Sequence, residues 1–143
     1  MELTHHHTFK KSERLCSKRL IDDLFDGKGK SISHYPIRIV YKVIPGAEQI
    51  APASILISVS KRRFKHAVKR NRVKRQIREA YRKNKHLLSG TLEKYTDSNL
   101  LIGFLWLSDK LYSSKEVEIC IQQLLKRITD HMNENKKNLA AHE

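Results

Sequence analysis

The chain has 143 residues and a formal net charge of +14, from 29 Lys and Arg against 15 Asp and Glu. This length predicts one domain with one modest core, and the strongly basic balance predicts an acidic partner, either nucleic acid or an anionic membrane surface. No apolar run approaches the length of a membrane span, and the N-terminus has no signal-peptide core. The two cysteines, Cys16 and Cys120, lie far apart without zinc-like spacing, which favours a reduced, cytoplasmic protein.

The two ends of the chain show little pattern. We expect a flexible N-terminus over residues 1–11, a single domain over residues 12–132 and a flexible tail over residues 133–143. His5, His6 and His7 are adjacent, so their imidazoles point in different directions, and we predict no metal site there.

The first predicted helix is capped by Ser12 or Ser17, runs to about Phe25 and ends at Gly27. One stripe of this helix is apolar and consists of Leu20, Ile21, Leu24 and Phe25.

Four segments are predicted to be strands, at residues 32–35, 37–43, 55–59 and 100–107. Residues 100–107 are apolar throughout, which is typical of a central strand buried on both faces. A last helix is predicted after Ser113, which with Glu116 forms a capping box. Its apolar stripe consists of Val117, Ile121, Leu124, Ile128 and Met132. With a further helix between the last two strands, the predicted class is α+β, with helices packed on one sheet.

That further helix lies in the most charged part of the chain. Residues 61–85 contain thirteen Lys and Arg and one acid, Glu79, so they hold +12 of the net charge of +14. Such a segment repels itself in a compact state, and phosphates would relieve that repulsion.

The segment also carries a helical pattern. Val73, Ile77, Ala80 and Tyr81 recur at helical spacing, and Val68 and Leu88 extend this apolar stripe. The opposite side collects Asn71, Arg75, Arg78 and Arg82. A disordered basic tail would show no apolar stripe. The alternative is a solvated charged face, but such a face normally mixes both signs.

These residues resemble the signature of the protein subunit of bacterial ribonuclease P. The resemblance is carried by Ser58-Val59-Ser60-Lys61-Arg62, then Ala67-Val68-Lys69-Arg70-Asn71-Arg72-Val73-Lys74-Arg75, then Ile77-Arg78-Glu79-Ala80. It implies an αβββαβα sandwich like domain 2 of ribosomal protein S5, with a left-handed β-α-β crossover. Elsewhere the resemblance is one of pattern, in the same element order.

The resemblance also implies a function. In that family the RNA subunit, with Mg²⁺, removes the 5′ leader of precursor tRNA by hydrolysis. The protein binds the catalytic RNA and holds the leader. We therefore expect a cytoplasmic monomer, one copy per catalytic RNA, with precursor tRNA as second partner and Mg²⁺ held by the RNA.

By this resemblance, the surface that binds the catalytic RNA consists of Lys61, Arg62, Arg63, Lys69, Arg70, Asn71, Arg72, Lys74, Arg75, Arg78 and Arg82. The leader is expected in a cleft between the first helix and the sheet, lined by Ile21 and Phe25, with Ile39 or Tyr41 as its floor. An ordinary core role for Ile21 and Phe25 is the alternative. Ile21 replaces a frequent phenylalanine, and Phe64-Lys65 replaces a loop that often contains glycine.

No catalytic cluster is evident in the chain itself. Asp22 and Asp23 are adjacent on a helix and therefore face about 100° apart. Three other classes of basic protein are alternatives to a ribonuclease P subunit. A small ribosomal or other structural RNA-binding protein remains as the alternative. A helix-turn-helix protein would need a helix, not a strand, before the basic helix, and a membrane-surface helix would need a broader apolar stripe.

Overall fold

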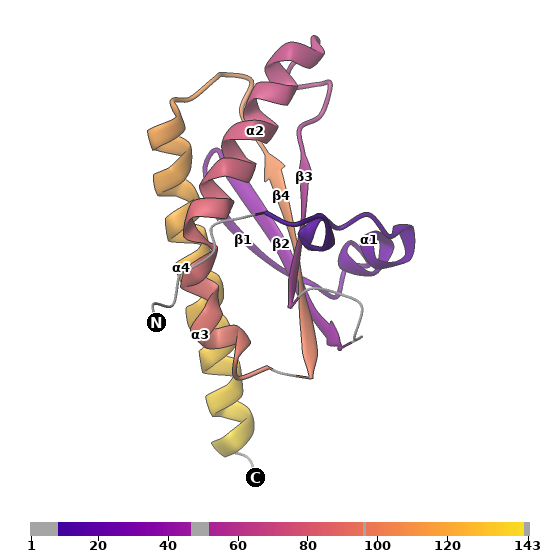
Figure 1. The fold of residues 1–143 in the computed structure, drawn as a ribbon, viewed down its shortest axis with the longest axis vertical. Helices are drawn as coiled ribbons and strands as arrows, with labels where there is room; N and C mark the ends of the chain where they lie inside the picture. The colour runs from indigo at the N-terminus through magenta and orange to yellow at the C-terminus, as the bar shows by residue number, and fades with distance from the viewer. Residues whose placement is uncertain (1–8, 47–51, 96, 142–143) are drawn as a thin grey trace.

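The computed structural model describes residues 9–46, 52–95 and 97–141, with side chains described as far as Glu134. Figure 1 shows the arrangement of its helices and strands. In chain order the elements are η1 (Lys11–Glu13), α1 (Lys18–Leu24), β1 (Lys30–His34), β2 (Ile37–Pro45), β3 (Ala53–Ser58), α2 (Ala67–Asn84), η2 (Lys85–Leu88), α3 (Ser89–Leu92), β4 (Ser98–Trp106) and α4 (Ser114–Ala141).

The four strands form one mixed sheet in the order β1-β2-β4-β3. β1 with β2 and β2 with β4 are antiparallel, whereas β3 and β4 are parallel and are connected through α2. The predicted β-α-β unit and the α+β class are confirmed. β4 lies inside the sheet and is buried along almost its whole length, as its unbroken apolar run predicts.

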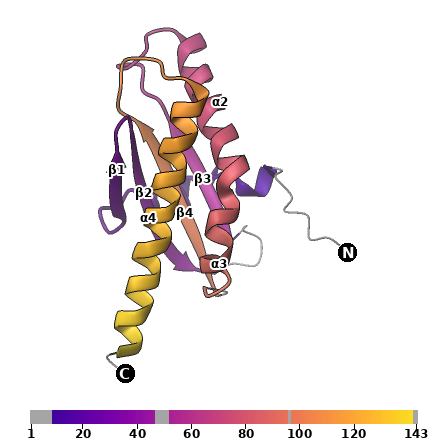
Figure 2. The same cartoon turned by 90° about the vertical axis from the view of Figure 1, so that its left-hand side faces the viewer.

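α2 and α4 pack together on one face of the sheet, and α1 packs on the other (Figures 1 and 2). The larger core cluster lies under α2 and α4, and the smaller one lies under α1. Ser17 caps α1, because its Oγ accepts a hydrogen bond from the Leu20 N–H at 3.4 Å. Among the described residues, no helix is both long and apolar enough to cross a membrane.

Two helix ends differ from the sequence-based expectations. α4 continues past Met132 to Ala141, where a tail was expected, because polar residues alone do not stop a helix already anchored by its apolar face. α2 ends at Asn84, although the predicted helical pattern extends to Leu88, and the chain then turns through η2 and α3. His5, His6 and His7 lie outside the described residues.

The segment from Phe9 to Leu15 is held against the domain rather than being free. The Phe9 ring makes an edge contact with Tyr81 of α2, with centroids 6.2 Å apart. A carboxylate oxygen of Glu13 lies 2.8 Å from the ammonium of Lys85, beyond the end of α2. Further along, the N–H of Leu15 donates to the carbonyl of Ile55 at 2.8 Å. These contacts place the segment along the open side of β3.

The buried stripe of α2 gives a stability prediction with a matched control. Val73 is 0% exposed, whereas Val68, one turn closer to the N-terminus of the same helix, is 79% exposed. Val73→Asp would bury an unpaired carboxylate, which costs more than most small domains can lose. We expect it to abolish the cooperative thermal transition.

The control is Val68→Asp, which adds the same charge to the exposed first turn of α2. Its effect on the free energy of unfolding should stay within about 0.5 kcal/mol. Circular dichroism melting of the two variants checks this, and equal melting temperatures would contradict the assignment of the two faces.

Candidate nucleic-acid interface

α2 presents one face to the core and one to solvent. The buried face consists of Val73, Gln76, Ile77, Ala80, Tyr81 and Asn84. The predicted apolar stripe is therefore confirmed from Val73 to Tyr81, and Leu88 in η2 extends it. Val68 does not extend it, because it lies in the first turn of α2 and is left in solvent. The opposite face carries Asn71 and Arg75, both exposed.

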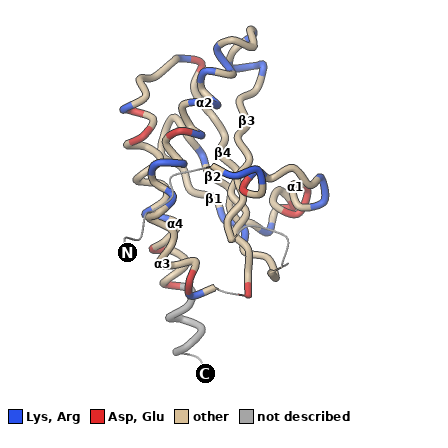
Figure 3. Tube along the Cα trace, viewed as in Figure 1, with Lys and Arg blue, Asp and Glu red and all other residues tan. Residues whose placement is uncertain are grey.

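The basic residues gather at the N-terminal half of α2 and in the loop before it (Figure 3). The first turn of α2 contains no acid, and the N-cap residue His66 makes no side-chain capping bond. The N-terminal end of a helix carries a partial positive charge and unpaired N–H groups. Lys69 and Arg70 add full positive charges there, so this end of the helix favours an anion.

Most of the side chains predicted to bind RNA have no partner among the described residues of the protein. Lys61, Arg62, Lys69, Asn71, Arg72 and Arg75 are exposed, and Arg63, Arg70, Lys74, Arg78 and Arg82 are half-buried. Within the described part of the chain, only two of these eleven side chains make a hydrogen bond or ion pair, namely Arg70 and Arg82. The surface therefore holds positive charge that the protein itself does not neutralise.

Arg70 fixes the loop that precedes α2. Its guanidinium donates to the carbonyl of Phe64 at 2.8 Å and to that of Lys65 at 2.9 Å. Phe64 is buried at the same place. These contacts hold the loop where a glycine was expected by resemblance, so Arg70 has a structural role besides any contact it makes with RNA.

Arg82 is the predicted contact whose charge is already paired. Its guanidinium contacts both carboxylate oxygens of Glu79, at 2.6 and 3.0 Å. The hydrogen bond from Arg82 lowers the pKa of the Glu79 carboxyl. Because the pair is partly exposed and screened by solvent, it contributes little to stability and can open.

The second predicted surface lies on the α1 side of the sheet. Leu20 and Leu24 of α1 are buried against Leu101 of β4, and Ile21 is half-buried beside them. Phe25 is different, because 43% of it is exposed. A Cβ built on Gly103 would lie 3.0 Å from Phe25 Cζ, so the ring lies directly on the bare backbone of β4. Ile21 therefore packs partly against the α1 cluster, and Phe25 offers an open aromatic face.

The prediction that Ile39 or Tyr41 forms the floor beneath α1 is wrong. Both point to the other face of the sheet, where Ile39 is 0% and Tyr41 2% exposed. Tyr41 there lies 3.5 Å from His131 of α4 through its hydroxyl. Alternate residues of a strand face opposite sides, so Ile39 and Tyr41 share one face of β2, whereas Val40 and Ile44 share the other with Arg38 and Lys42. Both sets contain apolar residues that a helix can cover, so the sequence does not tell which set faces α1.

The residues that do face α1 are the intervening ones. Val40 and Ile44 pack against the α1 cluster, and Val40 pairs with Gly103 across β2 and β4. By the same alternation, Arg38 and Leu105, which are also paired, lie on this face beyond Phe25. The sequence contains one signal of this arrangement, Gly103, because a glycine inside a buried strand often marks the close approach of another group.

Lys42 anchors the end of α1 on this face of the sheet. Its ammonium lies 2.7 Å from a carboxylate oxygen of Asp26 and 3.1 Å from the carbonyl of Asp23. The hydrogen bond from Lys42 lowers the pKa of the Asp26 carboxyl. In the sequence, Phe25 lies between Asp23 and Asp26, which are both bound by Lys42. The position of Phe25 over β4 is therefore defined from both sides.

The described residues do not bring together three His, Cys, Asp or Glu side chains that could hold a metal ion. Cys16 is exposed and Cys120 is buried, and both are free thiols. Burial raises the pKa of the Cys120 thiol to about 11, which keeps it protonated and unreactive at neutral pH.

Comparisons with known proteins agree on one family. The sequence family described as Ribonuclease P matches residues 9–129. A ribonuclease P protein component from Porphyromonas gingivalis is 46% identical over 123 residues, covering 85% of this chain and 87% of the relative. One from Chlorobium phaeobacteroides is 40% identical over 86 residues, covering 59% and 58% of the two chains.

Solved structures agree on the fold. The ribonuclease P protein from Thermotoga maritima has a TM-score of 0.62 at 22% identity and covers 80% of this chain and 96% of its own. A Staphylococcus aureus ribonuclease P protein, a mutant described as having defective mRNA degradation activity, has a TM-score of 0.59 at 20% identity, covering 82% and 89%. With the family match and the 46% identity, these findings show that the chain belongs to the ribonuclease P protein component family and is a subunit of ribonuclease P.

Proposed function

We propose that this subunit binds the catalytic RNA of ribonuclease P through α2 and the loop before it, and the 5′ leader of precursor tRNA on the α1 side of the sheet. The observation that carries this proposal is the unpaired basic surface at the N-terminal half of α2. Lys and Arg contacts to phosphates supply most of the affinity of such surfaces. Asn71, which is uncharged and exposed within it, would contact a ribose or a phosphate through its amide.

The leader site is supported by Phe25. Single-stranded RNA is commonly bound by stacking on exposed aromatic rings beside basic groups. Phe25 offers such a ring on a rigid floor, and Arg38 lies on the same side of the sheet. Val40, Gly103 and Leu105 complete the floor in place of Ile39 and Tyr41.

Hydrolysis of the phosphodiester is assigned to the RNA subunit and to Mg²⁺ bound there. The described side chains of this protein do not bring together three His, Cys, Asp or Glu that could hold a metal ion. Their role is to bind and to position. The protein is expected to act as a monomer, one copy per catalytic RNA, in the cytoplasm.

Reconstitution tests the proposal as a whole. Adding the protein to a bacterial ribonuclease P RNA and a precursor tRNA at low magnesium should accelerate removal of the leader. A small ribosomal protein, the alternative function, would bind RNA without this acceleration. An equal rate with and without the protein would contradict the proposed function.

The α2 surface predicts a change in salt dependence. Arg72→Ala and Arg75→Ala each remove one exposed cation that does not touch the core. For each, the log–log slope of catalytic-RNA affinity against salt should become shallower by about 0.7 to 0.9. Lys126→Ala, an exposed lysine of α4, is the control and should keep the wild-type slope. Unchanged slopes in the arginine variants would assign this face to solvent.

The α1 side predicts a dependence on leader length. Phe25→Ala should weaken binding of precursor tRNA to the assembled enzyme by about 1–3 kcal/mol if the ring stacks on a base. The loss should disappear when the leader is shortened to one or two nucleotides.

The matched control is Tyr35→Ala, which removes an exposed ring between β1 and β2. It should bind long and short leaders as the wild type does. A melting curve must accompany Phe25→Ala, and an equal loss for both leader lengths in a folded protein would show that this ring does not touch the leader.

The assignment of catalysis to RNA gives a separate expectation. The protein without RNA should leave precursor tRNA uncut under conditions in which the reconstituted enzyme cleaves it completely. Gel analysis of the 5′ leader measures this. Cleavage by RNA-free protein that is abolished by changing its own carboxylates would overturn the assignment.

A further inference from the structure

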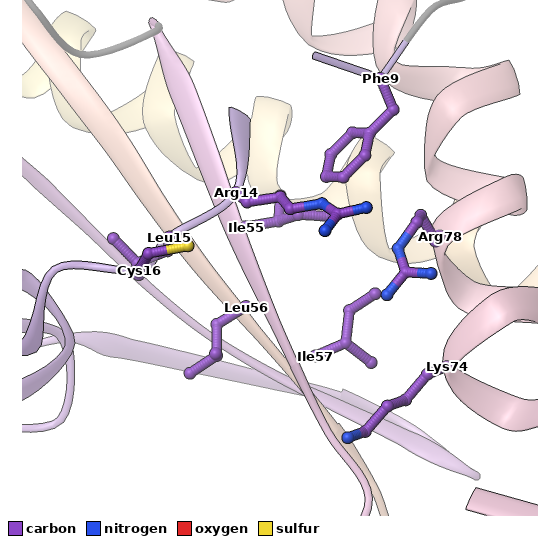
Figure 4. A pocket seen from close by; sticks show the side chains of 9 residues that line it. All are labelled: Phe9, Arg14, Leu15, Cys16, Ile55, Leu56, Ile57, Lys74 and Arg78. Carbon is purple, nitrogen blue, oxygen red and sulfur yellow. The ribbon is translucent and has the colours of Figure 1, made fainter. Parts of the chain in front are cut away.

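A pocket of about 180 Å³ lies at the open edge of β3, next to the α2 surface, whose Lys74 and Arg78 also line it. Figure 4 shows side chains from three parts of the chain converging on it. They come from the segment before α1, from β3 and from α2. The lining residues are Phe9, Arg14, Leu15, Cys16, Ile55, Leu56, Ile57, Lys74 and Arg78.

The chemistry of the lining is that of an anion site with an apolar floor. Among the described residues that line it are three cations, Arg14, Lys74 and Arg78, and no acid. Within the described residues, none of the three has an ion pair or a side-chain hydrogen bond. Three unpaired charges so close together repel one another, and a phosphate between them would relieve that repulsion.

An aromatic ring belongs to the same pocket. The guanidinium of Arg14 lies over the Phe9 ring, with Cζ 5.7 Å from the ring centroid. Phe9 is itself held by its edge contact with Tyr81, so ring and guanidinium are fixed together. A cation, an aromatic surface and an aliphatic floor are the groups that receive the phosphate and the base of a nucleotide.

The pocket is small and lies at a sheet edge. Sites that enclose a free small molecule usually measure about 300–1,000 Å³, so a ligand in this smaller pocket extends beyond it along the sheet edge. The N–H of Leu15 covers the edge of β3 by donating to the carbonyl of Ile55. Beyond Ile55, the same edge lines the pocket with Leu56 and Ile57. An extended chain can therefore enter and leave along β3.

We propose that this pocket binds one nucleotide of a single-stranded RNA segment, with its phosphate between Arg14, Lys74 and Arg78. This inference rests on the proposed function, because it takes RNA as the partner. The pocket reaches around the edge of β3, from Leu56 and Cys16 on the α1 side to Ile57 and Lys74 on the α2 side. The bound nucleotide thus connects the two faces of the sheet, and it comes either from the leader or from the catalytic RNA.

Arg14 gives the sharpest test, because it belongs to the pocket and not to α2. In one assay the affinity of the protein for the catalytic RNA is measured against salt. In the other, the affinity of the assembled enzyme for precursor tRNA is measured against salt, once with long and once with short leaders. Arg14→Gln should make the log–log slope shallower by about 0.7 in one of the two. A change in the first assay assigns the nucleotide to the catalytic RNA, and a change with long leaders alone assigns it to the leader.

Two further variants separate charge from structure. Arg14→Lys keeps the charge and should therefore keep the wild-type slope. If the role of Arg14 were purely structural, Arg14→Gln would also keep the wild-type slope. Lys126→Gln, on the exposed face of α4, should match the wild type in both assays. Wild-type slopes for Arg14→Gln in both assays would overturn the pocket while leaving the proposed function intact. Failure of the wild-type protein to bind or stimulate would instead reject the proposed function.

The native thiols offer an independent readout. Cys16 is exposed at the rim of the pocket, whereas Cys120 is buried, so a thiol-reactive photo-cross-linker attaches to Cys16. In the assembled enzyme it should cross-link to one short stretch of RNA, and Cys16→Ser should remove the signal. Mapping the cross-linked nucleotide identifies its source. The absence of any cross-link to leader or catalytic RNA would contradict the proposal.

Discussion

Burial of the apolar stripe of α2 is the interaction on which the rest of the molecule depends. Val73 and Ile77 are completely buried, and they hold a helix that, with eight Lys and Arg and one acid, carries half of the net charge of the protein. Hydrogen bonds to α4 and to the loop before it fix the orientation of α2 in this packing. The Gln76 amide donates to the carbonyl of Tyr112 at 2.9 Å, and the Asn84 amide donates to Glu118 at 3.1 Å. A self-repelling basic surface is thereby kept rigid, which lowers the cost of ordering it when it meets RNA.

The sheet separates two surfaces with different chemistry. On the α2 side the binding groups are charges, which suit the phosphates of a large folded RNA and lose strength as salt rises. On the α1 side the exposed group is the Phe25 ring on the bare backbone at Gly103, which suits an unpaired base. The pocket at the edge of β3 lies between them and combines both kinds of group. Under the proposed function, a single domain of this size would contact two RNA segments at once.

The sequence was sufficient where the local pattern has one solution. The spacing from Val73 to Tyr81 predicts both faces of α2, and the apolar run of β4 predicts its central place in the sheet. The sequence was insufficient for β2, because the neighbouring residues Ile39 and Val40 are both apolar. Only the packing of the helices decides that Ile39 faces α4 and Val40 faces α1. The pocket could not be predicted either, because Phe9, Ile57 and Arg78 meet only through the fold.

The central claim is that α2 and its preceding loop face the catalytic RNA. Lysine acetylation footprinting by mass spectrometry, with and without the catalytic RNA, tests it across the whole protein in one measurement. The account predicts that Lys61 and Lys69, both exposed, lose reactivity when the RNA binds. Lys115 and Lys126 of α4, equally exposed, should react as before. Protection of the α4 lysines with none at Lys61 and Lys69 would contradict the account.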